Sequence, residues 1–287
     1  MTTKARDGAA TVHEHIAEAR RTLEGAGLAT ADARLDAEVL ARHALGWDRA
    51  RLVADGRTTM PAGPAAQYAC MVARRAAREP VAFITGRREF WGLEFEVSRD
   101  VLIPRPETEL IVEAVRERRA PKAVRTIVDV GTGSGCLAVV LAREYPDARV
   151  IATDISTAAL AVATRNARRH AVDARLTLLR GDLLDALRGP VDVIVSNPPY
   201  VPSNVQLAPE IVNFEPEVAL YSGVDGLMLL ARLIADARAR LAEGGLFVIE
   251  FGLGQEDEIR ALALAAGWTS VETIADLQGI PRTAVME

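Results

Sequence analysis

The sequence predicts an α/β fold in which a doubly wound, mostly parallel sheet follows a separate helical segment. Strand-like and helix-like stretches alternate from Arg125 to the end of the chain, which is the pattern of a parallel sheet covered by helices. One early strand in this region runs into a glycine-rich turn. The chain up to about Glu79 is instead rich in Ala, Arg, Glu and Leu and has no β-branched runs, which favours helices.

Length and composition limit the possible classes of protein. The 287 residues suffice for one large domain or two smaller ones, and 49% hydrophobic residues support a sizeable core. The formal net charge of −5 gives no basic surface that would indicate a nucleic-acid partner. The chain starts without an apolar signal segment and has no run long enough for a bilayer. We therefore expect a cytoplasmic protein without a membrane partner.

Cysteine and histidine residues give no sign of a metal centre. Cys70 and Cys136 are far apart and form no C-x-x-C pattern, so we expect reduced thiols. The histidines lie outside the stretches that carry chemistry, and we expect them to be solvated helix residues. We predict no metal site.

The first 85 residues predict a bundle of about four helices. Gly25-Ala26-Gly27 ends the first helix, Thr30-Ala31-Asp32 begins the second, and Gly46 ends it. A further helix is expected over 64–78, and Pro80 ends the bundle. The bundle is either a recognition module for a partner or a lid over the catalytic domain, and these roles are compatible.

A short hairpin is expected after the bundle, because the stretch 89–97 alternates in polarity around Gly92. We expect its aromatic residues to serve in packing. The domain prediction is therefore a helical bundle over 1–85, a hairpin linker over 86–103 and a catalytic domain over 104–287.

The catalytic domain is expected to begin with a helix at Pro106, a residue suited to a first helical turn. Arg105 precedes it between two prolines and is either a substrate contact or a salt-bridge partner. The last two strands have no helix between them, so at least one strand should be antiparallel. The expected strands are 126–130, 149–153, 176–179, 191–196, 246–251, 269–274 and 282–286. The expected helices are 106–118, 136–145, 158–170, 227–241 and 256–266.

The glycine-rich turn is a candidate cofactor loop. It consists of Gly131, Thr132, Gly133, Ser134 and Gly135, between an expected strand and an expected helix. Glycines let the backbone approach a ligand closely and adopt positive φ. A dinucleotide fingerprint needs G-x-G-x-x-G, and the third glycine comes one residue early, which weakens an NAD-linked reading.

Two acidic residues strengthen the prediction of a nucleoside ligand. Asp154 ends the strand after the glycine-rich turn, in the position of a carboxylate that binds ribose hydroxyls. Asp182 follows the next strand, where it could face a purine amine. Each alone could be a helix cap, but with Asp129 before the turn there are carboxylates at three successive strand ends, and this pattern favours a nucleoside.

The segment Asn197-Pro198-Pro199-Tyr200 follows the buried strand 191–196 and is the candidate catalytic segment. Prolines end the strand, so the segment lies at the carboxyl edge, where open α/β sheets bind ligands. The Asn197 side-chain oxygen and the Pro198 carbonyl could orient an NH2 group, and Tyr200 offers a flat face for a planar amide or base. The long connection 204–222 is expected to be a functional loop.

These motifs resemble class I S-adenosylmethionine-dependent methyltransferases of the Asn-Pro-Pro-Tyr type, which have a Rossmann-like sheet. Further motifs resemble the release-factor glutamine methyltransferases, the PrmC/HemK family, across nearly the whole chain. They are Glu79-Pro80-x-x-Phe83-x-x-Gly86, Glu89-Phe90-Trp91-Gly92, Leu102-Ile-Pro-Arg-Pro-Glu-Thr-Glu109, Glu215-Pro216-x-x-Ala219-Leu220, Asp225-Gly226-Leu227 and Ile249-Glu250-Phe251-Gly252.

The resemblance implies methylation of the glutamine side-chain amide in the Gly-Gly-Gln motif of class 1 peptide chain release factors. S-adenosylmethionine would be the cofactor and S-adenosylhomocysteine the product. The resemblance implies that residues 131–135 and Asn197 contact the cofactor, that Asp154 binds its ribose and Asp182 its adenine. Asn197, Pro198, Pro199 and Tyr200 would form the amide pocket, and the bundle would help to dock the release factor.

Other functions remain open from the sequence. Relatives that methylate a glutamine of a large-subunit ribosomal protein share much of this pattern. Enzymes that methylate exocyclic amines of nucleic acids share the Asn-Pro-Pro-Tyr motif, although the acidic pI of about 5.6 counts against them. A non-catalytic adaptor is the alternative from a different class.

Overall fold

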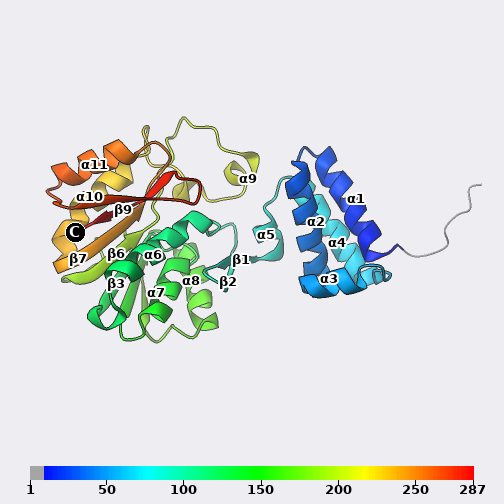
Figure 1. The fold of residues 1–287 in the computed structure, drawn as a ribbon, viewed down its shortest axis with the longest axis horizontal. Helices are drawn as coiled ribbons and strands as arrows, with labels where there is room; N and C mark the ends of the chain where they lie inside the picture. Colours follow the sequence, from blue (N-terminus) through cyan, green and yellow to red (C-terminus); the bar gives the residue numbers. More distant parts are fainter. Residues whose placement is uncertain (1–9) are drawn as a thin grey trace, which may run out of the picture. The chain divides into compact units, whose positions relative to one another are not determined.

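A computed structural model describes residues 10–287. The chain divides into two compact units, of which the first ends at Gly86 and the second begins at Arg87 (Figure 1). The first unit is helical and the second is an α/β unit. None of the helices within residues 10–287 combines the length and the apolar character that a membrane span requires.

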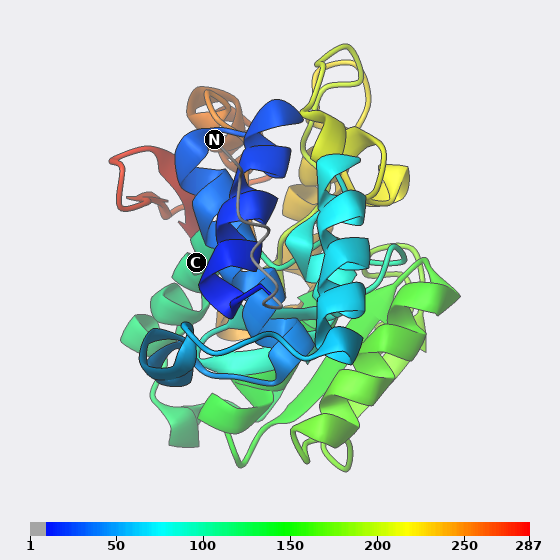
Figure 2. The same cartoon turned by 90° about the vertical axis from the view of Figure 1, so that its right-hand side faces the viewer.

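The helical unit packs its main helices around one core. Figures 1 and 2 show α1, α2 and α4 side by side. A capping box starts α1, because Thr11 Oγ1 accepts from Glu14 N and the Glu14 carboxylate accepts from Thr11 N. The helices are α1 (Val12–Gly25), α2 (Thr30–Leu45), α3 (Arg49–Asp55), α4 (Ala62–Ala76) and α5 (Val81–Thr85).

Two contacts between buried polar groups join α4 to α2 in this unit. The Tyr68 hydroxyl in α4 donates to the Ala37 carbonyl in α2 over 3.0 Å. Arg75 forms an ion pair of 2.7 Å with Asp36, and both side chains are largely buried. These contacts fix α4 against α2 in addition to the apolar packing.

The α/β unit opens with a hairpin of β1 (Arg87–Phe90) and β2 (Leu93–Glu96). Its turn residues Trp91 and Gly92 have φ of 54° and 68°, as in the tight hairpin turns with two left-handed residues. Phe90 and Phe95 are buried in the core of this unit. The segment that we expected as a linker therefore packs as part of the α/β unit.

The sheet has seven strands in the order β5-β4-β3-β6-β7-β9-β8. All neighbours are parallel except β9, which runs antiparallel to β7 and β8. The predicted α/β fold, with an antiparallel strand at the end, is confirmed. The strands are β3 (Thr126–Val130), β4 (Arg149–Asp154), β5 (Leu176–Arg180), β6 (Val191–Ser196), β7 (Leu241–Glu250), β8 (Val271–Ala275) and β9 (Pro281–Met286).

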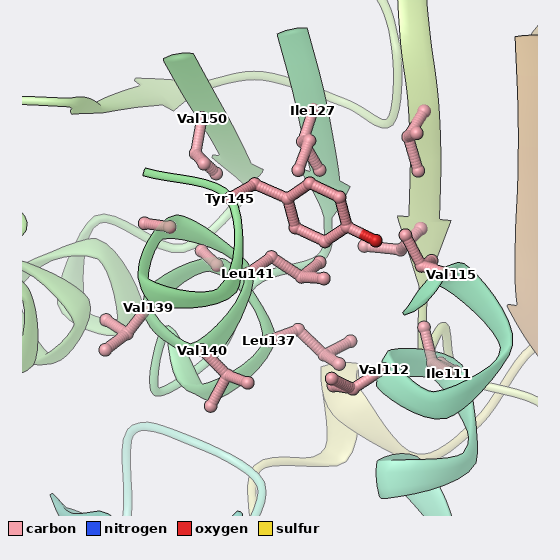
Figure 3. Close-up of a cluster of buried hydrophobic side chains, with 14 of the residues drawn as sticks. Ile111, Val112, Val115, Ile127, Leu137, Val139, Val140, Leu141, Tyr145 and Val150 are labelled. Carbon is pink, nitrogen blue, oxygen red and sulfur yellow. The ribbon is translucent and has the colours of Figure 1, made fainter. Parts of the chain in front are cut away.

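Both faces of the sheet are covered by helices, so successive residues of the central strands alternate between two apolar core clusters. Along β6, Val193 and Val195 belong to one core cluster and Ile194 to the other. Figure 3 shows the first cluster, where the Tyr145 ring lies between Leu141 and Ile127, and Leu137 lies beside Val112. The longer helices are α6 (Glu109–Arg118), α7 (Cys136–Glu144), α8 (Thr157–Arg169), α10 (Met228–Arg240) and α11 (Glu256–Ala265).

The strand order reverses between β3 and β6. From β3 the chain continues through β4 and β5 on one side, whereas β6 and β7 lie on the other. Val130 and Ser196, the last residues of β3 and β6, are direct neighbours in the register. The residues that follow each strand therefore emerge side by side, at the place where open α/β sheets form a crevice.

Asn166 connects the hairpin to the glycine-rich turn. Its side chain is fully buried in α8. Its Nδ2 donates to the carbonyls of Glu96 and Ser134 over 2.9 and 2.8 Å, and its Oδ1 accepts from Glu96 N over 2.8 Å. Each polar atom of this carboxamide thus has a backbone partner.

The Asn166→Asp variant should lower the free energy of unfolding by about 2–4 kcal/mol, because a buried carboxylate would face two carbonyls without donors. Chemical denaturation followed by circular dichroism measures the change. Gln278→Glu makes the same amide-to-acid change at an exposed position and should alter stability by less than about 0.5 kcal/mol. Equal effects of the two substitutions would contradict this role of Asn166.

Candidate active site

A cavity of about 380 Å³ lies at the carboxyl ends of the parallel strands. Its lining includes the turns after β3, β4, β5 and β6, together with parts of the segments 100–108 and 216–232. Most of the predicted site residues line this cavity. They are Gly131, Thr132, Gly133, Ser134, Asp154, Asp182, Asn197 and Pro199.

The glycine-rich turn has the backbone that its sequence predicts. Gly131, Gly133 and Gly135 all have positive φ, at 71°, 54° and 82°. A Cβ atom added at Gly131 or Gly133 would meet only open space, whereas one at Gly135 would lie 3.0 Å from the Ala163 Cβ. The first two glycines therefore leave room for a ligand, and Gly135 allows α7 to pack closely on α8.

Asp154 supports the turn from the end of β4. Its Oδ2 accepts from Gly133 N over 2.9 Å, and its Oδ1 accepts from Ser156 N over 2.8 Å. Burial raises the pKa of this carboxyl group, and the backbone donors act in the opposite direction. Each carboxylate oxygen has a further lone pair that could accept a ligand hydroxyl.

Asp182 lines the cavity and forms an ion pair with Arg232 of α10. The Arg232 Nη2 lies 2.8 Å from Asp182 Oδ2, and both side chains are about half exposed. The sequence predicts Asp182 at the cavity but gives no sign of Arg232. Because the partner comes from a helix 50 residues later, only the fold brings the two together.

Asp129 is a residue of the cavity lining that the sequence analysis counts among the strand-end carboxylates but gives no role of its own. It lies in β3 and is 1% exposed. Its Oδ2 accepts from Thr132 Oγ1 and Ala138 N, whereas Oδ1 is buried and has no hydrogen-bond partner among the described residues. Burial raises the pKa of this carboxyl group to about 7. The sequence signal for Asp129 is an acidic residue near the end of a mostly apolar strand, two positions before the first glycine.

Asn197 follows β6 and is partly buried in the cavity lining. Its Nδ2 donates to Thr108 Oγ1 over 2.9 Å, and that hydroxyl donates to Glu250 Oε2 over 2.6 Å. Glu250 is 1% exposed, and burial raises its pKa to about 7. The carboxamide is thus held from behind by side chains that the sequence prediction did not include.

Tyr200 takes a different position from the one expected. Its hydroxyl donates to Glu250 Oε1 over 2.9 Å, and its ring packs against the core cluster of the α10 and α11 face. Neither Tyr200 nor Pro198 belongs to the cavity lining formed by the described residues. In this structure Tyr200 holds the turn in place, and its ring is not a wall of the cavity.

The backbone of the same turn is fixed by Gln255 and Gly226. Gln255 Nε2 donates to the Tyr200 carbonyl over 3.1 Å, and Gln255 Oε1 accepts from Gly252 N over 2.8 Å. Gly226 has φ of 78°, and a Cβ atom there would lie 2.2 Å from the Tyr200 carbonyl oxygen. The chain around Gly226 therefore packs directly on the turn.

Arg105 anchors the long connection after the catalytic segment. Its Nη2 lies 2.6 Å from Glu215 Oε1, and the Glu215 side chain is only 1% exposed. Glu215 Oε2 also accepts from Ile103 N over 3.1 Å. Of the two roles open for Arg105, the structure shows the ion pair, formed with a buried carboxylate at the edge of the cavity.

The described residues were also compared with the side-chain groupings that bind metal ions in proteins. Among residues 10–287, no group of three or more His, Cys, Asp or Glu side chains could hold a metal ion.

Family models match both parts of the chain. The PrmC N-terminal domain matches residues 14–86, and the methyltransferase small domain matches residues 106–214. A release factor glutamine methyltransferase from Burkholderia pseudomallei is 45% identical over 257 residues, which cover 87% of this chain and 90% of the relative. One from Moorella thermoacetica is 42% identical over 95% of this chain and 96% of the relative.

The chain belongs to the release factor glutamine methyltransferase family. The family predicted from the sequence motifs is therefore confirmed.

Solved structures support the fold alone. The human METTL16 catalytic domain has a TM-score of 0.57 and 17% identity, covering 76% of this chain and 81% of that one. A methyltransferase from Pyrococcus furiosus has a TM-score of 0.53 and 18% identity, covering 76% and 96%.

In this family member, Gly226→Ala should lower methyl transfer at least about tenfold, because the Cβ atom would displace the Tyr200 carbonyl. Gly279→Ala is the matched control. Gly279 has nearly the same φ, 79°, and a Cβ atom there meets nothing within 4 Å. Steady-state assays of both variants separate the steric contact from the cost of positive φ. Equal activity of the two variants would refute the contact.

Glu250 should make stability depend on pH. Its pKa is about 7 in the folded chain and near 4.5 in the unfolded chain, so the folded state binds more protons between these values. Stability should therefore fall as pH rises from 5 to 8, by up to about 3 kcal/mol more in the wild type than in Glu250→Gln. Denaturation at several pH values measures this difference, and parallel pH profiles would contradict it.

Proposed function

We propose that this chain transfers a methyl group from S-adenosylmethionine to the side-chain amide nitrogen of the glutamine in the Gly-Gly-Gln motif of class 1 peptide chain release factors. The observation that carries the proposal is the position of Asn197. It lines the same cavity as the glycine-rich turn, in a chain 42–45% identical to release factor glutamine methyltransferases over most of its length.

The lining of the cavity fits the proposed cofactor. When bound, S-adenosylmethionine supplies a sulfonium methyl group to a nucleophile. The open space beside Gly131 and Gly133 admits a ligand close to the backbone, and the buried Asp129 Oδ1 suits the cofactor's ammonium group. Asp154 is assigned to the ribose hydroxyls, and Asp182 to the adenine edge together with Arg232. We assign Thr132, Ser134 and Gly135 to the same loop.

The catalytic segment would orient the substrate amide. An amide nitrogen is a poor nucleophile because its lone pair is delocalised. Asn197 Oδ1 and the Pro198 carbonyl would accept the two N–H bonds of the glutamine NH2 group and direct its lone pair towards the methyl group. Pro199 would complete the amide pocket, with Tyr200 holding its shape from behind. Positioning and electrostatics of this kind lower a barrier by several kcal/mol.

The substrate is a protein, and the finer assignments follow from the family. We propose that the helical unit, over about 1–85, helps to dock the release factor, with a hairpin over 86–103 and the catalytic domain over 104–287. We propose a cytoplasmic reaction without a stable nucleic-acid or membrane partner. The net charge of −5 agrees with a partner other than nucleic acid.

Mass spectrometry of a purified release factor, after incubation with this chain and S-adenosylmethionine, tests the proposal. We expect one added methyl group on the Gly-Gly-Gln glutamine. Asn197→Ala should lower turnover at least about 100-fold, since it removes the main amide acceptor, and should weaken cofactor binding by less than about tenfold. Calorimetry with S-adenosylhomocysteine measures the binding.

Gln278→Ala removes an exposed carboxamide and should leave turnover unchanged. Methylation of a large-subunit ribosomal protein or of RNA, with none on the release factor, would contradict the proposed substrate. Near-normal turnover in Asn197→Ala would contradict the role of that side chain.

A further inference from the structure

A buried carboxylate lies behind the candidate catalytic amide. Glu250 ends β7, and it accepts from Thr108 Oγ1 over 2.6 Å and from the Tyr200 hydroxyl over 2.9 Å. Thr108 Oγ1 in turn accepts from Asn197 Nδ2 over 2.9 Å. Thr108 is 2% exposed and Glu250 is 1% exposed. These side chains form one continuous path of hydrogen bonds from the core to the cavity.

The chemistry of the groups determines which one donates and which one accepts in each hydrogen bond of this path. In this structure both Glu250 carboxyl oxygens accept hydrogen bonds from hydroxyl groups, and a threonine hydroxyl has a single proton to donate. Because that proton goes to Glu250, the Thr108 oxygen has only lone pairs for Asn197. Asn197 must therefore turn its NH2 group towards Thr108. Its Oδ1 atom is then left for the cavity.

The orientation matters because the two ends of a carboxamide have similar shapes and opposite hydrogen-bonding roles. In the observed orientation, an oxygen is available to accept from a substrate NH2 group. After a rotation of 180°, Asn197 would present its own NH2 group, and two donors would face each other. Shape alone distinguishes these states poorly, so a hydrogen-bonding partner has to select one.

We propose that Thr108 and Glu250 are positioning residues that hold the Asn197 carboxamide with its oxygen towards the substrate amide. This inference rests on the proposed function, since it assigns these side chains a part in the same reaction. Neither residue touches the reacting atoms. Both act through Asn197, and Glu250 also acts through Tyr200, whose hydroxyl it holds.

The surroundings of Glu250 show how strongly its two contacts matter. Burial, the largest influence, raises the pKa of its carboxyl group to about 7. The hydrogen bonds from the Thr108 and Tyr200 hydroxyls act in the opposite direction and stabilise the accepting form. Burying an acidic group costs free energy unless its oxygens accept hydrogen bonds. Both hydroxyls are therefore expected to keep donating to Glu250.

Nuclear magnetic resonance tests the orientation without any activity measurement. The chain has only four asparagines, Asn166, Asn197, Asn204 and Asn213, so asparagine-selective ¹⁵N labelling gives few side-chain signals. The Asn197 pair is assigned by its loss in Asn197→Ala. Thr108→Val should shift this pair and raise its hydrogen exchange rate with solvent about tenfold. Thr108→Ser should restore the wild-type signals, and unchanged Asn166 signals show that the fold is intact.

Kinetics test the consequence. Thr108→Val and Glu250→Gln should each lower kcat about 10- to 100-fold, with KM for the release factor and affinity for S-adenosylhomocysteine changed less than about threefold. Because both act on one path, the double variant should lose no more than the worse single variant. Thr108→Ser should recover most of the kcat lost in Thr108→Val. Thr269→Val, at an exposed hydroxyl, is the control.

The two tests separate this inference from the proposed function. Unchanged Asn197 signals in Thr108→Val would overturn the positioning role, whatever the substrate is. Additive losses in the double variant would also overturn it, since the residues would then act independently. If the wild type left release factors unmethylated while the Asn197 signals responded as expected, the proposed substrate would fail and the held orientation would stand.

Discussion

The pairing of β3 with β6 is the contact on which the site depends. Both strands are buried by apolar side chains on each face, so their register is set by packing against two layers of helices. The register brings Val130 and Ser196 together, and the next residues of each strand are the start of the glycine-rich turn and Asn197. A proposed cofactor loop and a candidate catalytic amide are thereby fixed at one edge, although 66 residues separate them in the chain.

This arrangement explains why several sequence motifs outside the strand ends contain the residues that they do. Arg105 and Glu215 are an ion pair that anchors the connection beside the cavity, and Glu250 receives the hydroxyls of Thr108 and Tyr200. A side chain at position 226 would clash with the Tyr200 carbonyl oxygen, which explains the glycine there. Segments that are far apart in the sequence thus hold either the proline-containing turn or the connection that follows it.

The site combines two kinds of surface. The glycine-rich turn presents backbone groups and nearby carboxylates to the cavity. Burial raises the pKa of both Asp129 and Asp154. The turn after β6 offers an uncharged carboxamide, which is held by Thr108 and, behind it, the buried Glu250. This division agrees with the proposed reaction between a cationic donor and a neutral amide, in which the carboxylates would face the cofactor and the uncharged acceptors would face the substrate.

The sequence by itself determined the α/β class, the parallel strands, the glycine-rich turn and the catalytic segment. These features depend on local signals, namely apolar runs, glycines that need positive φ and prolines that end a strand. The family also followed from motifs in the chain. Tertiary structure alone decided the position of Tyr200, the pairing of Asp182 with Arg232 and the path from Asn197 through Thr108 to Glu250. Each of these contacts joins residues 50 or more positions apart, and such partners are chosen by the packing of strands and helices rather than by neighbouring residues.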